Sequence, residues 1–187
     1  IVAVGAAKNG FASGHIRVFR WTTSDWVQLG SDVLGENTLD NLDHSMALSR
    51  DGSTIALGAP RNRRGNRGAR GSCRVWSFDG TNWVQKGPDI DGEALMDRSG
   101  TAVGLSADGS VVIVSAQSNQ NSAGHARIFR FVNNAWVQVG VDLDGRVPGN
   151  LFGQDVAISD DGSIAAVSGL RNGNNQNTGH VRVFQFA

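Results

Sequence analysis

The chain has 187 residues, with 17 basic and 17 acidic side chains, so its formal net charge at pH 7 is zero. A chain without net charge has no global field that would steer it toward nucleic acid or anionic lipid, which argues against these partners. Cys73 is the one cysteine, so a disulfide framework within the chain is excluded. No apolar stretch reaches the length of a membrane-spanning helix, so direct membrane insertion is not expected.

Short motifs recur along the chain at intervals of 57 and then 53 residues. The turn tripeptide Asp-Gly-Ser begins at Asp51, Asp108 and Asp161, and the tripeptide Trp-Val-Gln begins at Trp26, Trp83 and Trp136. Recurrence at this period indicates an array of similar supersecondary units that bury their apolar faces against one another. The predicted units are 1–34, 35–91, 92–144 and 145–187, of which the first and the last are partial.

In chain order, residues 1–6 match the second strand of a unit whose complete form lies in the second copy. That copy predicts four strands, at 46–49, 54–59, 73–78 and 83–90, without a helical pattern. Asp51-Gly52 predicts a two-residue hairpin turn between the first two strands, because both central positions of that turn favour positive φ. The third copy repeats the four strands, and the chain ends in a third strand at 181–186.

Four antiparallel strands per unit are typical of a β-propeller blade, so the predicted fold is all-β with propeller-type blades. The first strands are short and carry Ala or Gly, which suits the crowded centre of a propeller. The 14 predicted strands amount to about 3.5 blades, whereas propellers close with roughly four to eight. Three explanations stay open: the chain is a fragment of a longer polypeptide, two copies combine, or the units stack openly as a solenoid or filament.

These motifs resemble the FG-GAP repeats of the integrin α-subunit propeller, and more closely the FG-GAP-like repeats of large secreted and surface proteins. Phe152-Gly153 supplies the FG position before an inner strand, and Gly58-Ala59-Pro60 supplies the GAP position after a second strand. The FG position is half kept at Gly100. The resemblance covers the whole chain and implies an extracellular or cell-surface protein that serves adhesion, ligand binding or scaffolding.

The same resemblance raises the question of calcium, which family members often hold in a loop between the first two strands. Calcium takes six to eight oxygen ligands. Here each such loop is a tight turn with one or two carboxylates, those of Asp51, Asp108 and Asp161 among them. We therefore expect these aspartates to be structural turn residues, and we expect no metal and no other cofactor.

Arginine recurs in the third strand of each unit, and aspartate recurs in the fourth. The arginines are Arg17, Arg74, Arg127 and Arg182, and the aspartates are Asp32, Asp89 and Asp142. A repeating pair of arginine and carboxylate, within or between blades, is the expected use, with a ligand-facing ring of arginines as the alternative.

Tryptophan and histidine also hold fixed repeat positions. Trp26, Trp83 and Trp136 are expected to pack the blades, and an exposed outer ring that stacks on sugars is the alternative. His15, His125 and His180 share one position, each in a different unit. We expect each of these histidines to form a structural hydrogen bond at the start of its strand.

One loop does not repeat, and it is rich in arginine. Its five arginines are Arg61, Arg63, Arg64, Arg67 and Arg70. With no acidic residue among them, they form a local basic patch that suits a sulfated or carboxylated polysaccharide, or an acidic protein partner. The alternative is a solvated loop without a ligand. Nucleic acid is not expected there, because the loop has no interleaved aromatic residues.

The chain has no nucleophile elbow, phosphate-cradling loop or zinc-ligand spacing, so we do not expect an enzyme. The first hypothesis is a non-catalytic extracellular module for structure, adhesion or protein interaction. Its partners would be other proteins or further copies of itself, as in a surface filament or appendage. The second hypothesis is a carbohydrate-binding, lectin-like propeller, and the third is a recognition domain of a larger enzyme.

Overall fold

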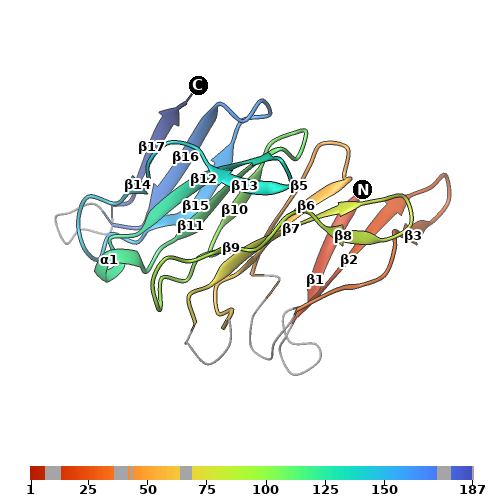
Figure 1. Cartoon of the computed structure of the whole chain (residues 1–187), viewed down its shortest axis with the longest axis horizontal. Helices are drawn as coiled ribbons and strands as arrows, with labels where there is room; N and C mark the ends of the chain where they lie inside the picture. Colours follow the sequence, from red (N-terminus) through yellow and green to blue (C-terminus); the bar gives the residue numbers. More distant parts are fainter. Residues whose placement is uncertain (7–13, 36–41, 43, 64–68, 172–177, 187) are drawn as a thin grey trace.

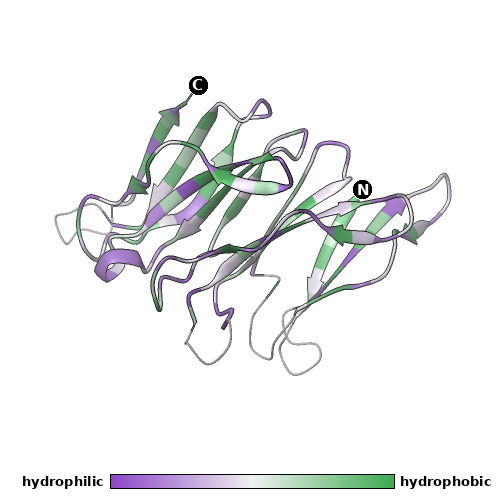
Figure 2. Ribbon diagram, viewed as in Figure 1, coloured by the Kyte–Doolittle hydropathy of each residue, from purple (hydrophilic) through white to green (hydrophobic). Residues whose placement is uncertain are grey.

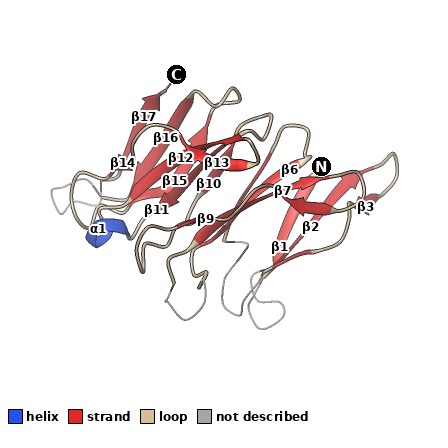
Figure 3. Cartoon of the chain, viewed as in Figure 1, coloured by secondary structure: helices blue, strands red, loops and turns tan. Residues whose placement is uncertain are grey.

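The computed structural model describes residues 1–6, 14–35, 42, 44–63, 69–171 and 178–186, and the statements below concern these residues (Figure 1). They form 17 β-strands and one short helical segment, so the predicted all-β fold is confirmed (Figure 3). The helical segment, α1 (Asn119–Ser122), was not expected, and Gln120 and Asn121 within it have positive φ. No helix in the described ranges is long and apolar enough to span a membrane.

The strands form four separate antiparallel sheets, which we number from first to fourth in chain order. The first sheet contains β1 (Val2–Ala6), β2 (His15–Trp21), β3 (Trp26–Gln28) and β4 (Val33–Leu34). The second contains β5 (Ser45–Leu48), β6 (Thr54–Ala59), β7 (Ser72–Phe78), β8 (Trp83–Gln85) and β9 (Ile90–Asp91). The third contains β10 (Val103–Leu105), β11 (Val111–Ala116), β12 (His125–Val132), β13 (Ala135–Gln138) and β14 (Leu143–Asp144). The fourth contains β15 (Phe152–Ile158), β16 (Ile164–Gly169) and β17 (His180–Gln185).

The fourth strand of each complete unit differs from the prediction, which had one strand from 83 to 90. The structure has two short strands there, β8 and β9, and both pair with β7. The strand is interrupted at Gly87, which has a φ of +75°, and at Pro88, which has no N–H to donate to the neighbouring strand. Gly30 and Gly140 have positive φ at the equivalent breaks. This division explains why the structure has 17 strands where the sequence predicted 14.

The Asp-Gly turns also differ from the predicted two-residue type. The loop spans four residues, because the N–H of Ser49 bonds to the carbonyl of Thr54 at 2.9 Å, and Gly52 has the positive φ of +71°. The carboxylate of Asp51 accepts hydrogen bonds from the Ser49 hydroxyl at 2.7 Å and from the Ser53 N–H at 2.9 Å. The same bonds hold the turns at Asp108 and Asp161. Hydrogen bonds from serine to the aspartate therefore stabilise these turns, and only the glycine of each turn has a positive φ, whereas the predicted type requires two such residues.

Buried apolar residues form three cores, each between two consecutive sheets, which we call the first, second and third seams. Successive side chains of a strand point to opposite faces of its sheet, so one strand supplies two seams. Leu57 of β6 faces the first seam and Ala56 faces the second. The strands β6 and β11 are therefore buried along their whole length, and they are predominantly apolar (Figure 2).

The innermost turns of the last three sheets bond to one another in series. The N–H of Arg50 donates to the carbonyl of Ala107 at 3.0 Å, and the N–H of Ala107 donates to the carbonyl of Asp160 at 2.9 Å. The side chains of Arg50 and Asp160 also form an ion pair, although the third sheet lies between their sheets. The sheets thus converge at their inner turns, as propeller-type blades do. The count of about 3.5 blades in this chain stays a prediction.

Candidate functional site

Two outer sheet faces have no neighbouring sheet among the described residues. We call the outer face of the first sheet the first flank and that of the fourth sheet the last flank. The first flank exposes Val2 and Val4, and the last flank exposes Ile164, Val181 and Val183. Contiguous exposed apolar side chains of this kind are typical of surfaces that bind another protein.

The flank residues occupy repeat positions that are buried elsewhere in the chain. Val183 is 68% exposed, whereas the equivalent Val75 and Ile128 are 1% and 4% exposed. Val4 is 53% exposed, whereas the equivalent Leu57 is 0% exposed. The two flanks therefore carry the same kind of surface as the two sides of an internal seam.

The recurrent arginines bond both within and between sheets. In the first two units the predicted pairs are present, with Arg17 Nε 3.0 Å from Asp32 and Arg74 Nε 3.2 Å from Asp89. The next two arginines instead reach the preceding sheet. Arg127 Nη2 donates to the carbonyl of Asp91, and Arg182 Nη1 donates to the carbonyl of Asp144, both at 2.7 Å.

Two of the three recurrent tryptophans bridge to the preceding sheet. Trp83 Nε1 donates to the carbonyl of Leu29 at 2.9 Å, and Trp136 Nε1 donates to that of Lys86 at 2.7 Å. Trp26 belongs to the first sheet and is exposed, with its ring centroid 5.4 Å from that of Trp21. These three side chains therefore do not form an equally exposed outer ring.

The structure describes three of the five loop arginines, and Arg64 and Arg67 lie outside the described residues. Arg61 and Arg63 are exposed and line a hollow together with Arg98. Arg70 does not line this hollow, and its side chain donates to the carbonyl of Glu93 at 2.8 Å. Arg98 was not among the predicted site residues, because it belongs to the following unit and lies beside the loop only in the fold.

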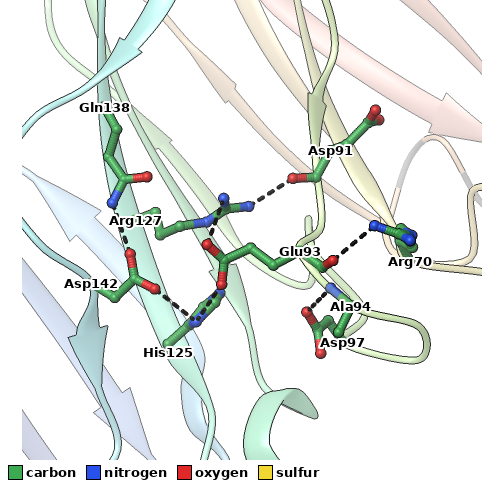
Figure 4. Close-up of polar contacts among 9 residues, drawn as sticks. All are labelled: Arg70, Asp91, Glu93, Ala94, Asp97, His125, Arg127, Gln138 and Asp142. Carbon is green, nitrogen blue, oxygen red and sulfur yellow. Dashed lines mark hydrogen bonds and ion pairs between the residues drawn. The ribbon is translucent and has the colours of Figure 1, made fainter.

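A polar cluster crosses the second seam (Figure 4). Glu93 follows β9 of the second sheet, whereas His125 begins β12 and Asp142 precedes β14 of the third. His125 Nδ1 lies 3.7 Å from Asp142 Oδ2 and 4.0 Å from Glu93 Oε2. In the third unit, therefore, the recurrent aspartate faces histidine, whereas the prediction was an arginine pair.

The imidazole of His125 is fully buried, and neither of its ring nitrogens has a hydrogen-bond partner in the described parts of the chain. Burial is the main cause that lowers the pKa of His125, and the positive charge of Arg127 acts in the same direction. The carboxylates of Asp142, Glu93 and Asp97 oppose this shift. The structural hydrogen bond that the sequence analysis expected for His125 is therefore not formed, whereas His180 Nδ1 lies 3.0 Å from the carbonyl of Arg171.

No family model and no curated protein sequence matches the chain. Among solved structures, the chain is similar to that of TolB from Acinetobacter baumannii, with 13% sequence identity and a TM-score of 0.45. The alignment covers 91% of this chain and 40% of that protein, so the chain spans less than half of TolB.

Proposed function

We propose that the chain is a non-catalytic structural and protein-interaction module of an extracellular or cell-surface protein, and that it acts by packing against further units of its own kind. The observation that carries this proposal is the exposure, on both flanks, of apolar side chains whose repeat equivalents are buried in the seams. The extracellular location rests on the resemblance to FG-GAP-like repeats.

The two flanks are complementary to each other. Val181 and Val183 lie at repeat positions that face the following sheet, whereas Val2 and Val4 lie at positions that face the preceding sheet. A last flank against a first flank would therefore repeat an internal seam. Such a contact is head-to-tail, so it can continue into a ring or a filament.

Arg17 adds a polar contact to the first flank. Its side chain is 48% exposed, and the equivalent Arg127 and Arg182 bond to backbone carbonyls of the preceding sheet. Arg17 would find such a carbonyl on a preceding unit. The contact between units is therefore expected to contain the same apolar packing and the same arginine-to-carbonyl bond as the internal seams.

The proposal is tested by the association state of the purified chain in analytical ultracentrifugation. We expect concentration-dependent association, because the exposed flank residues become buried when units meet. Val183→Glu on the last flank and Val4→Glu on the first flank should each weaken it. Val141→Glu is the control, since Val141 is 82% exposed and belongs to neither flank. A monomeric wild-type chain, or equal association of all three variants, would contradict the proposal.

The location is tested separately, by treating intact cells that produce the full-length protein with an impermeant protease. Cleavage of the protein on intact cells, or its recovery from the medium, would support an extracellular module. Protection until the cells are lysed would overturn the location and leave the association result unaffected.

Binding of an anionic polysaccharide is a second candidate, favoured by the hollow that Arg61, Arg63 and Arg98 line together. Arginine binds carboxylate and sulfate groups through paired hydrogen bonds. The test is retention on a sulfated-glycan column. Retention should fall in the Arg61→Ala, Arg98→Ala double variant and persist in Arg130→Ala, which removes an exposed arginine elsewhere. Equal retention of both variants would rule out this hollow.

A further inference from the structure

The cluster of Glu93, His125 and Asp142 offers one nitrogen and two oxygen donors around one point. The donor atoms of the three side chains all lie within 4.8 Å of one another. They come from two sheets, so they meet only when the second seam has formed. The side chain of Glu93 is 46% exposed and that of His125 is 1% exposed, so the cluster opens to solvent on one side.

Neighbouring side chains hold the other oxygen of each carboxylate. Gln138 Nε2 donates to Asp142 Oδ1 at 2.7 Å, and Arg127 Nη1 lies 3.5 Å from Glu93 Oε1 (Figure 4). The oxygens that remain, Asp142 Oδ2 and Glu93 Oε2, are the ones nearest His125 Nδ1. Outer contacts of this kind orient carboxylate ligands in metal sites.

The donor set suits zinc better than calcium. Zinc binds histidine nitrogen and carboxylate oxygen at about 2.0–2.2 Å, which separates tetrahedral ligands by roughly 3.3–3.6 Å. The distances of 3.7 and 4.0 Å from His125 Nδ1 are slightly longer, and the exposed Glu93 side chain has room to move inward. Calcium requires six or more oxygen ligands, and this cluster presents two carboxylates and an imidazole.

The cluster is not a feature that every unit repeats. In the second sheet Ser72 takes the place of His125, and after the third sheet Arg146 takes the place of Glu93. Asp32 and Asp89 are the equivalents of Asp142, and each bonds to an arginine. A purely structural contact of the repeat would recur between units, whereas this combination occurs once in the described ranges.

We propose that His125 Nδ1, Glu93 Oε2 and Asp142 Oδ2 bind a zinc ion across the second seam, with a fourth position open to solvent. This departs from the sequence analysis, which expected no metal. The ion would join the second sheet to the third and offset the repulsion between the two carboxylates. The site does not depend on the proposed function.

The test uses the whole chain, freed of metal with EDTA and titrated with zinc chloride by isothermal calorimetry. We expect one zinc ion per chain, and a loss of affinity of at least about tenfold in Glu93→Gln and in Asp142→Asn. Asp32→Asn is the matched control, because Asp32 holds the same repeat position and accepts the same kind of bond, from Gln28 at 2.9 Å. This control should bind zinc as the wild type does.

A second measurement guards against variants that do not fold. Zinc should raise the melting temperature of the wild type and of Asp32→Asn, and at the same zinc concentration should raise those of Glu93→Gln and Asp142→Asn much less. Circular dichroism without zinc confirms that each variant is folded. If the wild type binds no zinc, or if folded Glu93→Gln and Asp142→Asn bind it as tightly as the wild type, the proposed site is wrong.

Discussion

Gly58 of β6 and Gly100, which precedes β10, face each other backbone to backbone across the second seam. A Cβ at Gly58 would overlap the carbonyl oxygen of Gly100, and a Cβ at Gly100 would lie 2.9 Å from the Ala59 nitrogen and 3.0 Å from Gly58 Cα. Gly100 also has a φ of +85°. Gly58 and Gly100 are the glycines whose positions resemble GAP and FG in the sequence, and both lie where the backbones of two sheets approach closely.

Gly100→Ala should destabilise the chain by about 3 kcal/mol or more, because it combines overpacking with a left-handed backbone. Gly140→Ala is the control, since Gly140 has a φ of +70° but open space around its α-carbon. This control should cost only the backbone strain, about 1–2 kcal/mol. Urea unfolding measures both values. If both variants lose the same unfolding free energy, the two backbones do not approach closely at Gly100.

The pairs Arg74–Asp89 and Arg17–Asp32 share their chemistry and repeat position and differ in burial. The Arg74 and Asp89 side chains are 1% and 14% exposed, whereas those of Arg17 and Asp32 are 48% and 28% exposed. Arg74→Met should therefore cost about 3–5 kcal/mol, because it removes the cation that pairs with the mostly buried carboxylate of Asp89, which keeps the bond from Gln85. Arg17→Met should cost no more than about 1 kcal/mol. Denaturant unfolding measures the loss of unfolding free energy in each variant. A similar loss in both would show that burial does not set the contribution of the pair.

The indole of Trp136 joins the third sheet to the second through its bond to the carbonyl of Lys86. Trp136→Phe keeps most of the ring and removes the donor, so it should cost about 1–3 kcal/mol. Trp26→Phe should change the unfolding free energy by about 0.5 kcal/mol or less, since Trp26 is exposed. Thermal unfolding of both variants tests this order. A larger loss of unfolding free energy in Trp26→Phe than in Trp136→Phe would show that the bond from Trp136 does not stabilise the packing of the two sheets.

The turn at Asp108 should make stability depend on pH in the acid range. The hydrogen bond from the Ser106 hydroxyl is the largest cause that lowers the pKa of Asp108 from its usual 3.8, and bonds from Ser110 add to it. A lowered folded-state pKa means that the stabilisation is present above 3.8 and is lost as the pH falls through the folded value. In denaturant unfolding, Asp108→Asn should show a weaker decline in stability below pH 4 than the wild type. An unchanged decline would show that the Asp108 turn does not contribute.

The amino-acid sequence was enough to predict most of the strands, their order along the chain and their recurrence. Alternating apolar residues and Asp-Gly turns depend on residues that are close together in the sequence. One complete copy of the repeat therefore predicts the strands of the others. The continuous fourth strand and the two-residue hairpin turn were predicted wrongly. A glycine with positive φ divides the former, and side-chain bonds from Ser49 and Ser53 to Asp51 reshape the latter.

Which side chains meet across the seams could be seen only in the folded chain. Glu93 follows the last strand of the second sheet and His125 begins a strand of the third, and Arg98 lies beside the arginine loop of the preceding unit, because consecutive sheets pack face to face. The sequence shows which face of a strand is apolar, but it does not show which side chain of the next sheet lies opposite. That depends on the offset and the spacing of two packed sheets. The same dependence leaves Trp26 exposed and Trp83 buried, since a side chain that fills a seam requires a sheet on the other side.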